Sequence, residues 1–402
     1  MGKNIMKIIA IISEYNPFHL GHLHQINEIK KIFKNENIII ISIMSGNFIQ
    51  RGEPSIIDKF KRCETALNNG INLCFEIPVQ VSLSSAEGFA YGAIKILHEL
   101  KLIDFICFGC EIPDENKLNI IADTLISVNK NDLKKYLDLG FSFPKSQELM
   151  ISEKFNDINL TNFIKSPNNI LGIEYLKSIK ILNSPIKIIP IQRIGGNYND
   201  TFLHNQFSSA SAIRNVLLDS KNDISILKNH IPEETYKILN EEYSNKNFIN
   251  KEFMFKYIKY KLMTNKNIHK IEDMNEGLEN KFYSEILKSN SLNDLILNVK
   301  SKRYTYSRIS RILSKYFIGF ENFDRDYIKT LDNYVRILGF DKKGLELLNK
   351  LKKKSKLNLI SKFNKKNSTL APLDILATKS YSILNKSISP LQDFEKPPII
   401  KL

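Results

Sequence analysis

The sequence has no long apolar segment and few cysteines, and both absences limit the kind of protein it encodes. No apolar run approaches the roughly 20 residues needed to span a bilayer, which argues against a membrane protein. The first six residues are too few and too polar for a secretory signal, so we expect a cytoplasmic location. Four cysteines in 402 residues fit that reducing compartment.

The cysteines also give little support for a metal centre. Cys107 and Cys110 form a C-x-x-C pair, but Cys63 and Cys74 are eleven residues apart and supply no matching second pair. A structural zinc ion needs four ligands, so we interpret the cysteines as packing residues and predict no metal site.

Positive charge is concentrated in the second half of the chain. Residues 1–200 contain 22 Lys and Arg against 21 Asp and Glu, whereas residues 201–402 hold 36 basic and 22 acidic residues. A basic half joined to a neutral half favours a polyanionic partner, nucleic acid before a membrane surface. The alternative is a lysine-rich composition without function, but such a bias would be spread through both halves.

Short apolar runs rich in β-branched residues alternate with helical patterns in the first half, which is typical of parallel strands buried on both faces. We expect a doubly wound, Rossmann-like α/β domain over residues 1–220, with a helical insertion at about 112–183. The expected strands are Lys7–Ile12, Asn37–Met44, Leu73–Ile77, Phe105–Phe108 and Ile186–Ile191.

The strand patterns stop near residue 220, so we expect a mainly helical, basic region over residues 221–402. Ser307–Tyr316 and Tyr327–Leu338 are among its predicted helices. From about Asn364 onward several prolines predict an extended C-terminal tail on the surface.

The first expected strand leads into the segment Glu14-Tyr15-Asn16-Pro17-Phe18-His19-Leu20-Gly21-His22, after which apolar residues recur with helical spacing. His19 and His22 are three residues apart at the entry to that helix, so their side chains share one face. Helix N-termini bind anions through free N–H groups and the helix dipole, and the imidazoles add further donors. The pattern favours a phosphate site, with zinc binding and simple surface exposure as alternatives.

The H-x-G-H pattern resembles the signature of the nucleotidyltransferase superfamily related to class I aminoacyl-tRNA synthetases. The longer phrase from Ser13 to His22 is similar to one branch, the bacterial tRNA(Met) cytidine acetate ligases. Four later phrases resemble the same family in the same order, so the resemblance covers nearly the whole chain. They are residues 44–54, 108–109, 166–172 and 302–305.

The resemblance implies an ATP site with His19 and His22 as catalytic residues. A close-approach glycine, a two-way hydrogen-bonding amide and a cation, at positions 109, 168 and 193, suit such a site chemically. The implied ATP-binding residues are Ile12, Ser13, Glu14, Tyr15, Asn16, Pro17, Phe18, His19, Leu20, Gly21, His22, Leu23, His24, Gln25, Gly109, Asn168 and Arg193.

Ser209, Ser211 and Arg214 resemble a second superfamily signature, I-S-S-T-x-x-R, in which hydroxyls and a helix N-terminus grip the β- and γ-phosphates. The sequence departs from this signature with Ala210 at the second serine and Ser211 at the threonine. Donation from the backbone survives both changes, so we expect Ser209, Ser211 and Arg214 to bind ATP as well.

Enzymes of the family that the chain resembles use ATP and acetate to make acetyl-adenylate, and then acetylate N4 of the wobble cytidine in elongator tRNA(Met). Magnesium is compatible with this chemistry, although no carboxylate cluster in the chain requires it. Two other classes stay open: an adenylyltransferase for a small phosphorylated metabolite, and a non-catalytic RNA-binding adaptor.

The segment from Lys302 to Leu313 is the strongest nucleic-acid candidate of the second half. Three basic residues share one face of its predicted helix and three apolar residues share another, which predicts a basic face above a buried one. A solvated helix face without function is the alternative. The predicted tRNA contacts are Lys302, Arg303, Tyr304, Arg308, Arg311 and Lys315.

Overall fold

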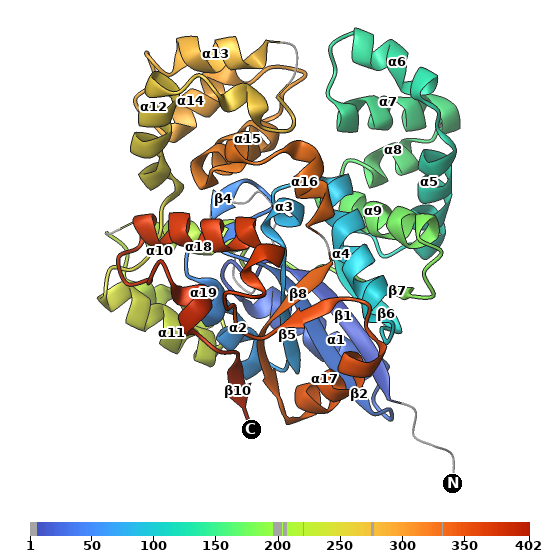
Figure 1. The fold of residues 1–402 in the computed structure, drawn as a ribbon. Coiled ribbons are helices and arrows are strands. Elements are labelled where there is room, and N and C mark those ends of the chain that lie inside the picture. Colours follow the sequence, from blue (N-terminus) through green and yellow to red (C-terminus); the bar gives the residue numbers. More distant parts are fainter. Residues whose placement is uncertain (1–5, 196–202, 204–206, 220, 275–276, 332) are drawn as a thin grey trace.

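The computed structural model describes residues 6–195, 203, 207–219, 221–274, 277–331 and 333–402 (Figure 1). Its central sheet has the strand order β10-β8-β5-β2-β1-β6-β7, and β9 also pairs with β8. The strands are β1 (Lys7–Ser13), β2 (Ile38–Ser45), β5 (Leu73–Ile77), β6 (Phe105–Cys110), β7 (Lys187–Gln192), β8 (Tyr334–Asp341), β9 (Asn358–Ile360) and β10 (Ile399–Lys401).

The five strands predicted in the first half are confirmed, and they run parallel to one another. Along β1, Ile8 and Ala10 enter one hydrophobic core while Ile9 and Ile11 enter another, as expected of a strand buried on both faces. In chain order, β2 and β5 are added on one side of β1, and β6 and β7 are then added on its other side. Ligands of doubly wound sheets bind at such a switch point, beyond the carboxyl ends of the strands.

Helices cover both faces of the sheet (Figure 1). Residues of α4, α9 and α17 pack into the first core, and residues of α1 and α2 pack into the second. The helices are α1 (Leu20–Ile32), α2 (Lys59–Asn68), α4 (Ala86–Leu100), α9 (Pro167–Ile181) and α17 (Lys342–Lys354), and the short α3 (Val79–Ser82) precedes α4.

The connection between β6 and β7 is helical where a helical pattern was predicted. It contains α5 (Glu115–Ser127), α6 (Lys130–Asp138), α7 (Phe143–Phe155), α8 (Ile158–Phe163) and α9. In Figure 1, α6 and α7 extend beyond the sheet beside a second helical group. That group consists of α12 (Phe255–Thr264), α13 (Leu278–Glu285), α14 (Leu292–Val299) and α15 (Tyr306–Ile318).

The remaining helices link these parts. They are α10 (Ala210–Leu218), α11 (Glu233–Ser244), α16 (Arg325–Thr330), α18 (Pro372–Leu384) and α19 (Gln392–Glu395). Short 3₁₀ turns lie at 224–229, 251–254, 268–270, 320–322 and 368–370, and Phe48–Ile49 pairs with Glu53–Pro54 as β3 and β4. Within the described part of the chain, every helix is too short or too polar to traverse a lipid bilayer.

The prediction of a helix over Tyr327–Leu338 is wrong. α16 ends at Thr330, and Tyr334–Asp341 forms β8, which pairs antiparallel with β5. The sequence pattern misled because a charged residue, Arg336, stands within the strand although its side chain is only 1% exposed. Its guanidinium forms an ion pair with the equally buried Asp393 of α19. A strand that carries a buried, paired charge has an interrupted apolar run, as β5 also does at Glu76.

The C-terminal segment is not an extended surface tail either. Leu373 and Tyr381 of α18 are fully buried, and the Tyr381 hydroxyl donates to the Ser55 carbonyl at 2.9 Å. β10 then adds a parallel strand beside β8. Pro372 stands in the first turn of α18, where proline is compatible with a helix. The segment therefore completes the sheet, although a division into folding units near residue 220 stays a prediction.

Candidate active site

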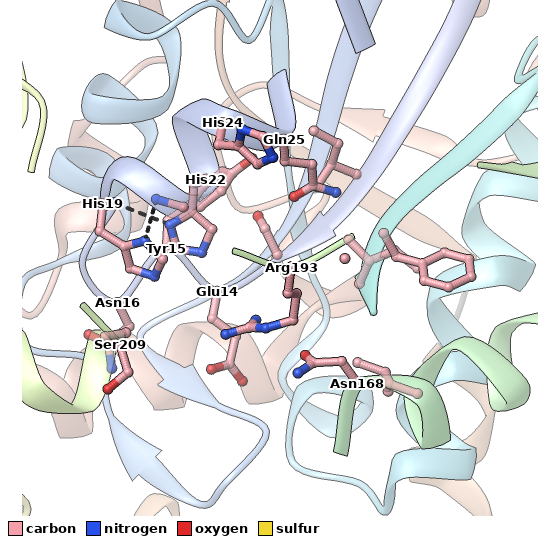
Figure 2. Close-up of a pocket in the computed structure, with 18 of the residues that line it drawn as sticks. Glu14, Tyr15, Asn16, His19, His22, His24, Gln25, Asn168, Arg193 and Ser209 are labelled. Carbon is pink, nitrogen blue, oxygen red and sulfur yellow. Dashed lines mark hydrogen bonds between the residues drawn. The ribbon is translucent and has the colours of Figure 1, made fainter. Parts of the chain in front are cut away.

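The loop after β1 places His19 at the N-terminus of α1. His19 has an extended backbone (φ −140°) and acts as the N-cap residue, with its Nδ1 accepting a hydrogen bond from the Gly21 N–H at 3.0 Å. The Nδ1 atom of His22 accepts from the His19 N–H at 3.2 Å, which closes a reciprocal cap. The rings stack with centroids 3.8 Å apart (Figure 2). The two histidines therefore lie together on one face, as their spacing predicted, and the two hydrogen bonds hold them as one unit.

Gly21 permits this arrangement because it has no side chain. A Cβ atom at position 21 would lie 2.9 Å from Cε1 of the His19 ring. That distance is shorter than carbon atoms of neighbouring residues normally approach, so a larger residue would push the ring away from its cap. The glycine between the histidines is thus required by the cap itself.

Both histidines are neutral and share one tautomer. Burial, and then the charges of Arg193 and Arg214, lower the pKa of His19 to about 3. Burial, and then the nearby His19 and Arg193, hold the pKa of His22 well below its usual value. Because each Nδ1 accepts a backbone hydrogen bond, each ring carries its proton on Nε2. Two Nε2–H donors are thereby available on rings that line a cavity.

This cavity has a volume of about 230 Å³ and lies at the carboxyl ends of β1, β6 and β7. Of the expected ATP-binding residues it is lined by Ile12, Ser13, Glu14, Tyr15, Asn16, His19, Gly21, His22, His24, Gln25, Gly109, Asn168, Arg193, Ser209, Ser211 and Arg214. Pro17, Phe18, Leu20 and Leu23 are not among its lining residues. Phe18 instead packs beneath the site, against Tyr15 and His22.

The N-terminus of α10 forms a polar wall of the cavity. Ser209 is its N-cap residue and accepts a hydrogen bond from the Ala212 N–H at 3.0 Å, as predicted for a capping serine. Arg214 donates to the Asn16 carbonyl at 2.7 Å and to the Ser211 hydroxyl at 3.2 Å. The arginine therefore ties α10 to the loop after β1 and keeps its charge beside the histidine pair.

The opposite side of the cavity is formed where β6 and β7 end. A Cβ atom at Gly109 would lie 3.1 Å from Cγ of Arg193, so the glycine lets the arginine stem cross β6 closely. Asn168, in the first turn of α9, donates through Nδ2 to the Glu111 carboxylate at 2.7 Å. In Figure 2, His19 and Ser209 lie on one side of the site and Asn168 on the other, with Glu14 and Arg193 between them.

The comparisons with known proteins agree with this geometry. Residues 6–395 match the family model of the HIGH Nucleotidyl Transferases. The chain belongs to this family. It is 47% identical over 400 residues to the tRNA(Met) cytidine acetate ligase of Clostridium novyi, with 98% of this chain and 99% of that protein covered. The enzyme of the same name from Clostridium acetobutylicum is 44% identical over 407 residues, covering 98% of this chain and all of that one.

Two solved structures of Thermotoga maritima TmcAL resemble the whole fold. The apo form of Thermotoga maritima TmcAL superimposes with a TM-score of 0.88 and 31% identity, and the form bound with alpha-thio ATP superimposes with 0.87 and 30%. Each comparison covers 98% of this chain and 99% of the other. The similarity therefore includes both the sheet and the helical regions.

Sequence reasoning missed several side chains of this HIGH family cavity. Four of them, Phe89, Phe108, Leu171 and Tyr175, come from three separate elements. Phe108 and Leu171 stand in the family phrases 108–109 and 166–172, which were a usable signal, whereas no motif marks Phe89 and Tyr175. Gln50 and Arg51 belong to the loop after β2, whose position at a strand end was a usable signal. Glu14 is the one carboxylate among the described lining residues, and it accepts a hydrogen bond from the Gln50 N–H at 2.9 Å. Burial raises the pKa of Glu14.

The cysteines are buried core residues. Burial raises the pKa of Cys107 to about 12. In the described ranges, His, Cys, Asp and Glu side chains nowhere gather in threes that could hold a metal ion.

The predicted basic face of the Ser307–Tyr316 helix is not exposed. α15 covers this segment, but Arg311 is 7% and Lys315 only 3% exposed. Lys315 lies 3.5 Å from the carboxylate of Asp273 and 3.7 Å from that of Glu272, and Arg308 donates to the Asp273 carbonyl at 2.8 Å. These residues fix α15 against the 268–274 segment, so the expectation of an open basic face is wrong.

The other predicted tRNA contacts differ in exposure. Lys302 is exposed, whereas Arg303 is half-buried and donates to the Leu137 carbonyl at the end of α6 at 3.1 Å. Tyr304 is buried, with the Arg308 guanidinium 4.8 Å from its ring centroid. Lys302 alone of the six presents an open side chain.

Proposed function

We propose that the chain is a tRNA(Met) cytidine acetate ligase, which activates acetate with ATP and acetylates the wobble cytidine of elongator tRNA(Met). The observation that carries this is the neutral histidine pair, whose Nε2–H groups line a cavity together with Arg193, Arg214 and the N-terminus of α10. Identity of 47% to a ligase of this name over nearly the full chain supports the choice of reaction.

In the first step an oxygen of acetate attacks the α-phosphorus of ATP. A P–O bond forms to acetate, the bond from the α-phosphorus to the bridging oxygen breaks, and pyrophosphate leaves. Negative charge grows on the phosphate oxygens, and donors held in place before the reaction stabilise it. His19 and His22 supply such donors without losing or gaining a proton, because their lowered pKa values keep them neutral at physiological pH.

In the second step the N4 amine of the cytosine attacks the acetyl carbon. The C–N bond forms, the bond from the acetyl carbon to the phosphate oxygen breaks, AMP leaves and the amine loses a proton. The base must leave its stack to reach the cavity, which favours an anticodon loop as substrate. Magnesium would accompany ATP, and its chemistry would be to neutralise the leaving pyrophosphate.

We place part of the RNA contact on α12 rather than on α15. Phe253, which is 50% exposed, lies in the 3₁₀ turn directly before α12. Tyr257 and Tyr260 of α12 are 43% and 68% exposed, and their spacing of three residues puts them on one face of the helix. Lys256 is exposed on the same face. Aromatic rings beside lysines bind unpaired nucleotides by stacking and charge attraction. The net charge of +14 in residues 201–402 favours this partner.

The test is an assay with ¹⁴C-acetate, ATP and purified tRNA(Met). We expect acetate-dependent release of pyrophosphate without tRNA, and label on cytidine when tRNA is present. Labelled tRNA should require all three components. Pyrophosphate release that depends on a phosphorylated metabolite instead of acetate would identify an adenylyltransferase, and tRNA binding without any release would identify an adaptor.

A further inference from the structure

Glu111, the first residue after β6, connects the end of that strand to the start of α9. Its Oε1 atom accepts from Nδ2 of Asn168 at 2.7 Å and from the Asn168 N–H at 3.4 Å. Its Oε2 atom accepts from the Asn169 N–H at 3.1 Å. Glu111 therefore caps the N-terminus of α9 and at the same time holds the side chain of Asn168.

Asn169 closes the contact from the other direction. Its Oδ1 atom accepts from the N–H groups of Glu111 at 3.0 Å and Ile112 at 3.3 Å, and its Nδ2 donates to the Phe163 carbonyl at 3.1 Å. Asn169 is fully buried. The position of Glu111 is thus fixed by both its backbone and its side chain.

This arrangement settles the orientation of the Asn168 amide. An ionised carboxylate only accepts hydrogen bonds, so the amide atom that faces Glu111 must be the NH₂ group. The remaining polar atom of the side chain is the oxygen, an acceptor. Asn168 lines the cavity, where Figure 2 shows it on the side opposite His19 and Ser209. The apolar residues Phe108, Leu171 and Tyr175 line the cavity as well.

The two sides of the cavity suit different parts of a nucleotide. The histidines, Arg214 and the α10 N-terminus suit a polyphosphate, whereas an amide among apolar and aromatic side chains suits a base. We propose that Glu111 is a positioning residue that locks the oxygen of Asn168 toward the nucleobase, so that the site selects a purine with an amine at position 6. Adenine offers that amine, and guanine presents at the same position a carbonyl that the oxygen repels. The inference rests on the proposed function, in which ATP is the nucleotide.

The experiment measures direct binding of three nucleotides by calorimetry, without acetate and without tRNA. They are ATP, GTP and purine ribonucleoside triphosphate, which has hydrogen in place of the adenine amine. The proteins are the wild type, Glu111→Ala, Glu111→Gln, Asn168→Ala and, as a control, Glu115→Ala. Glu115 is an exposed carboxylate in the first turn of α5 and matches the loss of charge.

The wild type and Glu115→Ala should bind ATP about 2- to 12-fold more tightly than purine ribonucleoside triphosphate, the range for one hydrogen bond, and should bind GTP more weakly still. Glu111→Ala should lose most of this discrimination because the freed amide can turn and donate. Glu111→Gln should keep part of it, since the glutamine oxygen still accepts from Nδ2 of Asn168 while the bond from the Asn169 N–H is lost. The double variant Glu111→Ala/Asn168→Ala should discriminate between the nucleotides as well as Asn168→Ala alone, because Glu111 acts only through Asn168.

A structural role limited to capping α9 predicts a different result. Glu111→Ala would then weaken the binding of all three nucleotides by the same factor. An unchanged ratio of the ATP and GTP affinities would overturn the inference. Failure of the proposed function gives a different observation, because the wild-type protein itself would then show no binding of ATP.

Discussion

Lowering the pH should destabilise the protein through His19. Burial and two arginines lower the pKa of this residue to about 3 in the folded state, against about 6.5 in an unfolded chain. Between these two values the unfolded state binds a proton that the folded state does not. The free energy of unfolding is therefore unaffected above about pH 6.5 and falls as the pH decreases below it. At pH 5.5 the loss from this one group is about 1.4 kcal/mol.

The variant His19→Asn isolates this contribution. Asparagine is a good N-cap residue whose oxygen accepts from the N–H of Gly21, so the cap is retained while the titrating ring is removed. Urea unfolding of both proteins at pH 7.5 and pH 5.5 gives the loss on acidification for each. The wild type should lose about 1.4 kcal/mol more than the variant, because all other titrating groups are common to both.

Equal losses in the two proteins would show that His19 titrates normally, and the neutral donor pair would then be refuted. The variant should also reduce acetate-dependent pyrophosphate release by about 10²- to 10³-fold, the usual effect of removing one preorganised donor. A variant with full activity would separate the stability effect from catalysis and exclude His19 as a phosphate donor.

Three further predictions concern the loops and the helical region. His22→Ala should abolish pyrophosphate release but leave tRNA affinity unchanged in a filter-binding assay. Gly52→Ala places a Cβ atom 2.3 Å from the Arg311 backbone nitrogen at φ +76°, so it should lower the free energy of unfolding in urea by several kcal/mol. Gly140→Ala is the control: it has φ +80° but no neighbouring atom, so it should lower that free energy by only about 1–2 kcal/mol through backbone strain. Tyr260→Ala should weaken tRNA binding about 5- to 150-fold, the range for one stacked base, while Leu391→Ala, equally a surface substitution, should not.

The sequence predicted those parts of the fold whose pattern is local. Each parallel strand of the first half is a short, mostly apolar run because both of its faces are buried, and the histidine loop is contiguous along the chain. β8 was not predicted because Arg336 interrupts its apolar pattern. The ion pair between Arg336 and Asp393 that stabilises the strand joins residues 57 positions apart. The contact of Glu111 with Asn168 joins residues separated by helices α5 to α8, so no local sequence pattern predicts it.

The charge distribution predicted a basic half but not where its charges lie. Lys315 and Arg336 belong to the basic excess, yet both are buried beside carboxylates and hold α15 and β8 in place. Arg311 belongs to it too and is only 7% exposed. The exposed run Lys352–Lys354 forms the end of α17. Two residues later the Lys356 N–H donates to the Glu99 carbonyl at the end of α4, the helix that precedes β6, so the run lies near the start of that strand. The cavity lies at the carboxyl ends of the strands, roughly 20 Å away along a seven-residue strand such as β1. The longest lysine run therefore lies toward the amino ends of the strands, away from the edge of the sheet that carries the cavity. Exposed stacking groups beyond the carboxyl edge of the sheet, and not net charge alone, define the surface on which the substrate should be sought.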